Sequence, residues 1–484
     1  MPKAGKEKGA FVQEIADPNV DFAQWYVDVV TKADLIDYAP VRGCVVFKPY
    51  GYNLWERTQA ALDQRFKATG HQNAYFPLLI PESFLLREAQ HVEGFTPEVL
   101  WVTTGGDEIL QERLAIRPTS EAIIGPMYSR WVQSYRDLPI LINQWCSVVR
   151  WEKATRPFLR TTEFLWQEGH TAHATPEEAQ QETLRMLEVY RDFYENEMAI
   201  WVVPGQKTEG EKFPGALKTY SVEALMGDGR ALQAATSHNL GQNFAEAYEI
   251  RYLDREGQLQ YAHTTSWGLS WRAIGALIMV HGDARGLVLP PKMAPIQVVI
   301  VPIGTGAEGE AVRTRARQIK EQLGEVARVH LDDRDEFTPG YKFNHWELRG
   351  VPLRLELGPR DLREQQCVLV RRDTGEKAVV PQDGLEGTVR ALLGEVQDNL
   401  LSRSRQRVQD NTTDVASVAE IGELVSARRG FAAGGFCGDA ACEQKVRDET
   451  GATIRNVPFA ERPVEACAVC GKPAKHSVLW ARSY

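Results

Sequence analysis

The sequence predicts an α/β (α+β) protein of about three domains, and three observations carry this prediction. The chain of 484 residues is too long for one hydrophobic core, since a domain averages roughly 150 residues. Pro290-Pro291 interrupts regular secondary structure, and segments with strand and helix patterns alternate after it. Four of the seven cysteines lie beyond Leu401. We therefore expect domains over residues 1–290, 291–400 and 401–484.

Composition and charge narrow the class of protein. With 43% apolar and 25% charged residues the chain is typical of a soluble globular protein, and no apolar run approaches the roughly 20 residues of a membrane helix. The start of the chain lacks the apolar stretch of a signal peptide, so we expect a cytoplasmic protein with no membrane partner. A net charge of −9 argues against nonspecific coating of nucleic acid, and we expect no DNA partner. Arg403, Arg405 and Arg407 form either a local basic face or a solvated helix face.

Apolar periodicity predicts two helices and three strands in the first region, over residues 52–68, 176–197, 138–142, 148–152 and 163–170. Alternation along the last strand places four side chains on one face, namely Phe164, Trp166, Glu168 and His170. Arg150 and Glu152 share a face of the strand before it. Charged groups on apolar-flanked strands are rarely buried unless they bind something, although a buried hairpin with paired charges is the plain alternative.

The second region predicts an α/β unit of roughly 100 residues, the usual size of a small domain. Its expected strands and helices cover residues 296–301, 309–323, 327–331, 351–355, 366–371 and 389–400. Gly304, Gly306 and Gly309 satisfy the dinucleotide-binding fingerprint in outline. A glycine-rich turn is the plainer interpretation, because nothing nearby offers hydride chemistry. The chain has no Gly-x-x-x-x-Gly-Lys-Ser/Thr segment, which excludes a P-loop.

Two short-spaced cysteine pairs occur near the C-terminus. Cys437 and Cys442 form one pair and Cys467 and Cys470 the other, a pattern that in a cytosolic chain more often binds zinc than forms disulfides. Four thiolates leave no open position, so the zinc would be structural. Residues 431–441 are poor in large apolar groups and should need the metal in order to fold. The remaining cysteines are expected to be buried hydrophobic residues, namely Cys44, Cys146 and Cys367.

Several motifs resemble a known family. Arg150-x-Glu152, with its loop and Phe164, resembles motif 2 of the class II aminoacyl-tRNA synthetases, and Gly268-Leu-Ser-Trp-Arg272 resembles motif 3. Further segments resemble prolyl-tRNA synthetases of the archaeal and eukaryotic-like type, namely residues 117–121, 158–161, 166–170 and 236–244. The resemblance implies an antiparallel-sheet catalytic domain, an α/β anticodon-binding domain and a small zinc-binding C-terminal domain. It also implies a homodimer, with Pro77 at the interface.

The resemblance implies that L-proline and ATP give prolyl adenylate, and that the prolyl group is then transferred to the 3′ end of tRNA(Pro). Arg150 would bind the α-phosphate and the proline carboxylate, and Arg272 the γ-phosphate, as the catalytic residues. A guanidinium suits both roles, because it binds oxyanions in bidentate fashion and stabilises transition-state charge. Further ATP contacts would come from Glu152, Thr161, Phe164 and Gln233. Mg²⁺ would accompany the phosphates. Leu269, Ala273 and Ala276 belong to an apolar stripe on a predicted helix, with Arg272 at its edge.

The proline pocket that the resemblance implies must pair an ammonium with carboxylate and pack an apolar ring. Its residues would be Thr119, Glu121, Arg150, Trp166, Glu168, His170, His238 and Ser270. Taken singly, Thr119 and Glu121 could simply open a helix, and Trp166 and the histidines could be core residues. His170 and His173 have the spacing of a metal pair, but no third ligand supports one.

Anticodon recognition is assigned, by the same resemblance, to Glu356, Arg360 and Arg363. The terminal Tyr484 is expected to turn back toward the catalytic domain. One alternative is a synthetase-like non-enzymatic tRNA-binding or regulatory subunit, but such relatives lose the motif arginines, which this chain keeps. A second alternative is a sister enzyme for another small amino acid such as threonine, whose pocket uses zinc ligands that this chain lacks.

Overall fold

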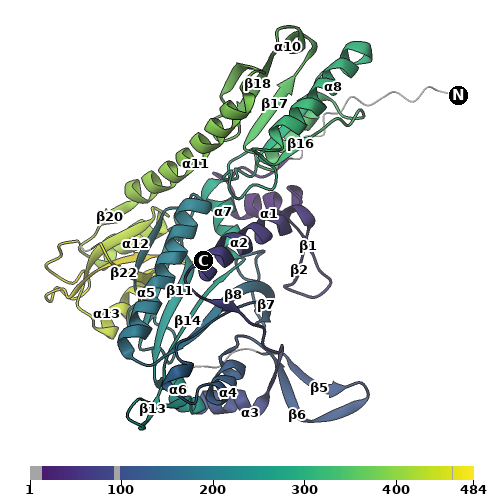
Figure 1. Cartoon of the computed structure of the whole chain (residues 1–484). Coiled ribbons are helices and arrows are strands. Elements are labelled where there is room, and N and C mark those ends of the chain that lie inside the picture. Colours follow the sequence, from purple (N-terminus) through teal and green to yellow (C-terminus); the bar gives the residue numbers. More distant parts are fainter. Residues whose placement is uncertain (1–13, 92–98, 461) are drawn as a thin grey trace.

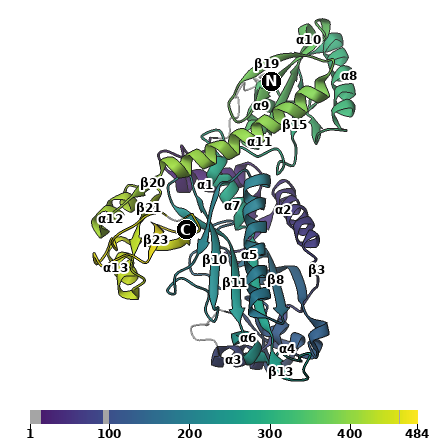
Figure 2. The ribbon, with the colours of Figure 1, turned by 60° about the vertical axis from the view of Figure 1, so that its left-hand side comes forward.

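The computed structural model describes residues 14–91, 99–460 and 462–484, and it confirms the expected mixture of an antiparallel sheet with a separate α/β unit (Figure 1). A large sheet forms the centre of the molecule, an α/β domain lies at one end, and the C-terminal residues lie beside the large sheet (Figure 2). Within the described residues, no helix has both the length and the apolar character needed to cross a membrane.

The large sheet has eleven strands that come from both the first and the last part of the chain. Their order is β20 (Thr412–Asp414), β21 (Phe431–Phe436), β23 (His476–Ala481), β22 (Thr453–Pro458), β9 (Val202–Gln206), β10 (Lys218–Leu225), β11 (Ala231–Gly241), β14 (His263–Ser270), β8 (Glu163–His173), β7 (Ile140–Val149) and β3 (Gln72–Asn73). All neighbours are antiparallel except the end pairs β20–β21 and β3–β7. The predicted hairpin is present, with Val148 opposite Phe164. Its first strand was wrongly expected to reach residue 152, because β7 ends at Val149 and Arg150 and Glu152 follow it.

Helices pack against the large sheet and bury its apolar side chains. They are α1 (Phe22–Lys32), α2 (Pro49–Ala68), α4 (Glu121–Trp131), α5 (Pro176–Asp192), α6 (Asn243–Tyr248) and α7 (Arg272–His281). Helix α5 packs against β11 and β14, and it starts where the Thr175 hydroxyl accepts from the Glu178 N–H at 3.2 Å. A π-turn, η2 (Phe193–Glu197), extends it, so the predicted helix over 176–197 is confirmed. The core under these helices is rich in tryptophan and tyrosine, including fully buried Trp25 and Tyr190.

Smaller elements complete the first region. They are β1 (Ile36–Tyr38), β2 (Val45–Phe47), β4 (Leu79–Pro81), α3 (Glu82–His91), β5 (Trp101–Gly105), β6 (Glu108–Ile116), the short helix η1 (Tyr135–Asp137), β12 (Arg251–Leu253) and β13 (Leu259–Tyr261). Strands β5 and β6 form a hairpin that projects from the body of the molecule (Figure 1).

The α/β domain contains a five-stranded sheet in the order β16 (Val329–Leu331), β15 (Val298–Pro302), β17 (Leu353–Leu357), β18 (Gln366–Arg371) and β19 (Lys377–Pro381). Its helices are α8 (Gly306–Leu323), α9 (Pro339–Leu348), α10 (Pro359–Arg363) and α11 (Leu385–Asp410). Helix α11 runs from this domain to the C-terminal residues, and the boundary expected at residue 400 falls inside it (Figure 1). Two arginines near the end of α11 contact other parts of the chain and do not simply face solvent. Arg407 donates to the Val280 carbonyl at 2.5 Å, and Arg405 lies over Trp201.

The C-terminal domain adds α12 (Val418–Ser426) and α13 (Ala440–Thr450) to its strands. It continues the large sheet, because Val457 of β22 pairs with Gln206 of β9. Buried charges also join the two parts: Glu223 accepts from Lys207 at 2.8 Å and from Arg455 at 2.9 Å. Burial lowers the pKa of Lys207, while the charges of Arg455 and Lys207 outweigh burial and lower the pKa of Glu223.

Two local expectations were wrong. Leu269 lies in β14 and not on a helix, because the chain turns at Trp271 before α7 begins at Arg272. Residues 431–436 form a fully buried strand and do not lack apolar contacts. Phe431, Ala432 and Phe436 pack into clusters that include Ile454 and Leu479, partners that are distant in sequence.

Candidate active site and metal centre

One cavity of about 350 Å³ brings together residues from six separate segments. Side chains of β8, β11 and β14 line it, together with Thr119, Glu121 and the loop between β9 and β10. The predicted residues that line it are Thr119, Glu121, Arg150, Phe164, Trp166, Glu168, His170, Gln233, His238, Ser270 and Arg272. Trp166 of β8 and Ser270 of β14 lie directly opposite each other in the sheet.

Two arginines supply positive charge to this cavity. Arg150 follows β7 and donates to the Pro118 carbonyl at 3.0 Å, and its guanidinium lies over the rings of Phe164 and Trp166. Arg272 opens α7 and donates to the Leu159 carbonyl at 3.1 Å. Burial lowers the pKa of both, and the charge of Arg150 lowers that of Arg272 further, yet a guanidinium stays protonated in proteins. In the part of the chain that the structure describes, neither forms an ion pair, so both are available to an anion.

Glu168 is a buried carboxylate with several hydrogen-bond donors. It accepts from the Gln144 amide at 2.9 Å, from the Ser120 hydroxyl, and from the Cys146 thiol at 3.5 Å. His170 Nε2 lies 3.0 Å from its other oxygen. Burial raises the pKa of Glu168, but the hydrogen bonds from His170, Ser120 and Gln144 outweigh it and leave the pKa lowered. The cavity therefore holds an ionised carboxylate that can pair with an ammonium group.

Trp166 is held by Cys146, a residue that the sequence analysis did not include in the site. Its indole N–H donates to the Cys146 sulfur at 3.1 Å, so Cys146 is part of a polar network and is not simply a buried hydrophobic residue. Cys146 and Gln144 lie directly opposite Trp166 and Glu168 in the β7–β8 pair. Alternation counted backward from Arg150 puts both on its face of the strand, which is the signal that could have identified them.

A second group surrounds His238. Its Nδ1 lies 3.0 Å from the Thr219 hydroxyl, and its ring centroid lies 4.7 Å from that of Phe213. Burial and the nearby charges of His170 and Lys207 lower the pKa of His238 to about 3, so this imidazole is neutral at pH 7. Phe213 belongs to residues 207–217, the loop between β9 and β10. We call this segment the 207–217 loop; sequence patterns did not identify it as part of the site.

Two predicted ATP residues do not line the cavity. Glu152 lies in the loop after β7 and accepts from Arg160 at 2.6 Å. Thr161 lines a neighbouring cavity of about 360 Å³, together with Thr155 and Arg156 of the same loop. Arg156 also lies over the ring of Tyr484, whose hydroxyl donates to Asp228 at 2.6 Å. The C-terminal residue thus contacts the catalytic part of the chain, as expected.

The three residues expected to read the anticodon lie in the α/β domain. Glu356 is buried and accepts from Arg354 at 2.8 Å, whereas Arg360 and Arg363 are exposed on α10. Arg360 pairs with Glu364 at 2.9 Å, and Arg363 with Glu308 at 3.4 Å. Exposed pairs of this kind are weak, so both guanidiniums can exchange their partners for phosphate or base groups.

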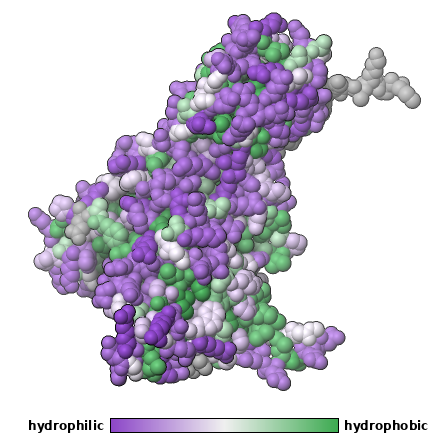
Figure 3. Space-filling view, in the orientation of Figure 1, coloured by the Kyte–Doolittle hydropathy of each residue, from purple (hydrophilic) through white to green (hydrophobic). Residues whose placement is uncertain are grey.

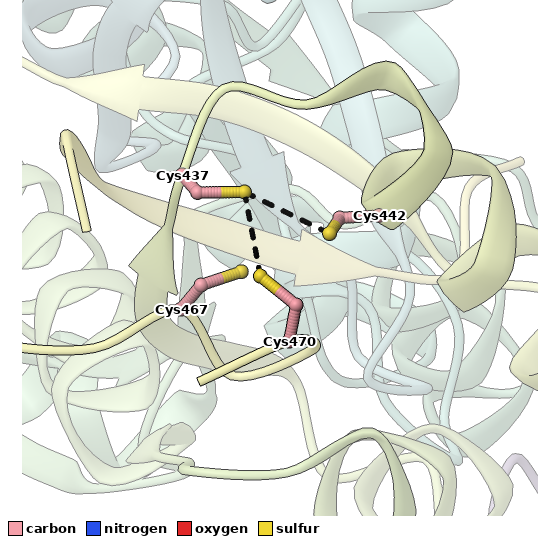
Figure 4. A group of neighbouring side chains, drawn as sticks. All are labelled: Cys437, Cys442, Cys467 and Cys470. Carbon is pink, nitrogen blue, oxygen red and sulfur yellow. Dashed lines mark hydrogen bonds between the residues drawn. The ribbon is translucent and has the colours of Figure 1, made fainter. Parts of the chain in front are cut away.

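Four cysteines converge in the C-terminal domain (Figure 4). The Cys437 sulfur lies 3.7 Å from those of Cys442 and Cys470, and all four sulfurs lie within 4.8 Å of one another. A tetrahedral zinc with bonds of about 2.3 Å separates its sulfurs by about 3.8 Å. Burial raises the pKa of Cys467, but backbone N–H groups of the turn outweigh it and lower the pKa to about 7. Donor type, spacing and charge all fit a zinc ion.

Sequence models of three families match consecutive parts of the chain. The model described as tRNA synthetase class II core domain (G, H, P, S and T) matches residues 101–281. The model described as anticodon binding domain matches residues 297–392, and the one described as prolyl-tRNA synthetase, C-terminal, matches residues 418–484.

Whole proteins are similar along the full length. The chain is 59% identical to a proline–tRNA ligase of Symbiobacterium thermophilum, over 99% of this chain and 100% of that protein. It is 57% identical to a proline–tRNA ligase of Alkaliphilus oremlandii, with the same two coverages. A crystal structure of prolyl-tRNA synthetase from Cryptosporidium parvum, complexed with halofuginone and AMPPNP, superposes with a TM-score of 0.93 at 43% identity. That superposition covers 97% of this chain and 99% of the other.

Proposed function

The chain belongs to the prolyl-tRNA synthetases of class II, and we propose that the cavity lined by Arg150, Arg272, Glu168 and Trp166 is where it joins L-proline to AMP. The enzyme activates L-proline with ATP and transfers the prolyl group to tRNA(Pro). One observation carries the site assignment: two unpaired guanidiniums and an ionised, fully hydrogen-bonded carboxylate line the same cavity.

Adenylate formation brings the proline carboxylate against the α-phosphate of ATP, where negative charges repel. Arg150 would bridge the α-phosphate and the carboxylate, and Arg272 would bind the γ-phosphate. Phe164, which lies under the Arg150 guanidinium, would stack on the adenine ring. Glu152, Thr161 and Gln233 would complete the nucleotide site, the first two after movement of their loop. Mg²⁺ would be held largely by the phosphates themselves.

Recognition of proline would use the other groups of the cavity. Glu121 and Glu168 would pair with the secondary ammonium, with Thr119 and His170 holding them in place by hydrogen bonds. Trp166 would pack against the pyrrolidine ring, and His238 and Ser270 would border it. A neutral His238 suits this role, because a second cation would repel the ammonium.

The other parts of the assignment rest on the arrangement of the domains. We propose domains over 1–290, 291–400 and 401–484, with α11 shared between the last two. Glu356, Arg360 and Arg363 would contact the anticodon of tRNA(Pro). Cys437, Cys442, Cys467 and Cys470 would hold one structural zinc. The enzyme would act in the cytoplasm as a homodimer, without DNA or membrane partners.

A pair of variants tests the proline assignment. Trp166→Ala removes the flat wall of the pocket, so the KM for proline should rise about ten-fold or more while the KM for ATP changes little. Phe164→Leu is the matched variant on the same strand, and it should raise the KM for ATP instead. Steady-state ATP–pyrophosphate exchange measures both constants. Equal effects of Trp166→Ala on the two substrates would contradict the assignment.

A further inference from the structure

The 207–217 loop has one side on the cavity and the other on the C-terminal domain. Glu211, Lys212, Phe213 and Pro214 line the cavity. The Phe213 N–H donates to the Thr219 hydroxyl at 2.9 Å, and that hydroxyl lies 3.0 Å from His238. The position of this loop therefore sets the position of the His238 side of the cavity.

Helix α13 holds the opposite side of the loop. The Thr208 hydroxyl, which is buried, donates to the Glu443 carboxylate at 2.8 Å. One turn further along α13, Arg447 forms an ion pair with Glu211. Glu443 and Arg447 are four residues apart, so both project from the same face of the helix. The loop backbone lies against this face, since a Cβ at Gly210 would be 2.8 Å from a Glu443 oxygen.

We propose that Glu443 and Arg447 of the C-terminal domain are positioning residues for the proline pocket, because they hold the 207–217 loop over it. Neither residue lines the cavity, so each acts through the loop. The ATP side, at Arg150, Phe164 and Arg272, forms no hydrogen bond or ion pair with α13 among the described residues. The two contacts of α13 thus set the affinity for proline and leave that for ATP unchanged. The proposal rests on the proposed function of the cavity.

The Thr208–Glu443 and Glu211–Arg447 contacts should affect the KM for proline to different extents. The Thr208–Glu443 hydrogen bond is buried at both ends, so Glu443→Ala should raise the KM for proline about five- to ten-fold. The Arg447–Glu211 pair is partly exposed, so Arg447→Ala should raise it about two- to five-fold. Glu443→Gln keeps an acceptor for Thr208 and should restore most of the wild-type KM. In a double-mutant cycle, Thr208→Val should add little to Glu443→Ala.

The experiment is ATP–pyrophosphate exchange with proline and ATP varied in turn, on the full-length protein. Lys445→Ala is the matched control, because Lys445 lies on α13 and pairs only with Glu449, at 3.9 Å, among the described residues. Thermal melting and metal content identify variants that are simply misfolded. An unchanged proline KM in Glu443→Ala and Arg447→Ala, with Trp166→Ala still raising it, overturns the inference alone. Wild-type protein without proline-dependent exchange overturns the proposed function instead.

Discussion

Glu168 shows how single side chains set the charge of the site. A buried carboxylate ordinarily becomes protonated, yet Glu168 has donors from β7, from Ser120 and from His170 that keep its pKa lowered. The pKa of His170 changes in the opposite direction to that of Glu168. Burial lowers its pKa, but the hydrogen bond to Glu168 and the charges of Glu121 and Glu168 outweigh burial, so the pKa is raised above 6.5. The two residues therefore form a buried ion pair at mildly acidic pH.

This pair predicts a pH-dependent stability. A raised pKa means that the contribution of His170 is fully present below pH 6.5 and is lost as the pH rises through its folded pKa. The lowered pKa of Glu168 means that its contribution is present above pH 4.5 and is lost as the pH falls through its folded pKa. The difference in Tm between wild type and His170→Gln should thus be largest between pH 4.5 and 6.5 and should shrink at higher pH.

Thermal melts from pH 5 to 9 provide the measurement. Each unit of pKa difference corresponds to about 1.4 kcal/mol of stability. The exposed His476, replaced in the same way, serves as the control and should leave the pH dependence unchanged. A Tm difference between wild type and His170→Gln that stays constant across this range would show that the ion pair does not form.

At the residue scale, sequence periodicity predicted one face of the pocket well. Alternation along residues 163–170 placed Trp166, Glu168 and His170 together, and all three line the cavity. Strand geometry allows this, because the period of two is a local property of the chain. Phe213 could not be found in this way. It reaches the cavity from a loop whose position depends on contacts with α13, more than 200 residues later in the chain.

At the scale of elements, the sequence predicted several of the helices and strands but not how they join. The strands at 298–302 and 366–371 and the helix α8 lie close to their expected ranges. The continuous sheet through β22 and β9 was not predictable, because strand pairing between residues 206 and 457 leaves no local pattern. The C-terminal domain was expected to depend on zinc for its order, whereas Val446, Ile454 and Trp480 give it an apolar core as well.

Zinc should therefore fix the turns that carry the cysteines, within a domain that also has a core. Elemental analysis of chelator-washed protein should find about one zinc per chain, and Cys467→Ser should lose it. Limited proteolysis of Cys467→Ser should then cut the chain around residues 437–475, while the catalytic part resists. Cys44→Ser, which changes a cysteine far from the cluster, is the control and should retain the metal. Metal-free wild type with four freely titratable thiols would refute the zinc site.

At the scale of the whole molecule, exposed apolar side chains lead us to expect a contact with a second copy of the chain. Tyr75 is 70% exposed and Trp131 is 47% exposed, although both rings lie beside buried groups, Arg117 and Phe76. Leu78 and Leu79 are exposed in the same segment. Apolar side chains gather in the lower part of the molecule, whereas polar surface covers most of the α/β domain (Figure 3). Exposed apolar side chains gathered in one segment favour an interface there.

This surface predicts a homodimer that one charge can disrupt. Sedimentation equilibrium of the wild type should give twice the 54.4 kDa of the chain. Leu78→Glu places a charge in the interface and should weaken the dimer by about 2 kcal/mol or more, which raises its dissociation constant about 30-fold. Val379→Glu is the matched control, because Val379 is 63% exposed in the α/β domain, away from this surface. A wild-type monomer, or a dimer unaffected by Leu78→Glu, would place the interface elsewhere.

The central claim is that one cavity joins L-proline to AMP with the help of Arg150 and Arg272. ATP–pyrophosphate exchange, measured with each of the twenty amino acids in turn, tests this claim most directly. Proline should support the fastest exchange, and Arg150→Ala and Arg272→Ala should each slow it by about 100-fold or more, because each loses about 3 kcal/mol of transition-state stabilisation. Full exchange activity in either variant, or exchange that proline does not stimulate, would contradict the account.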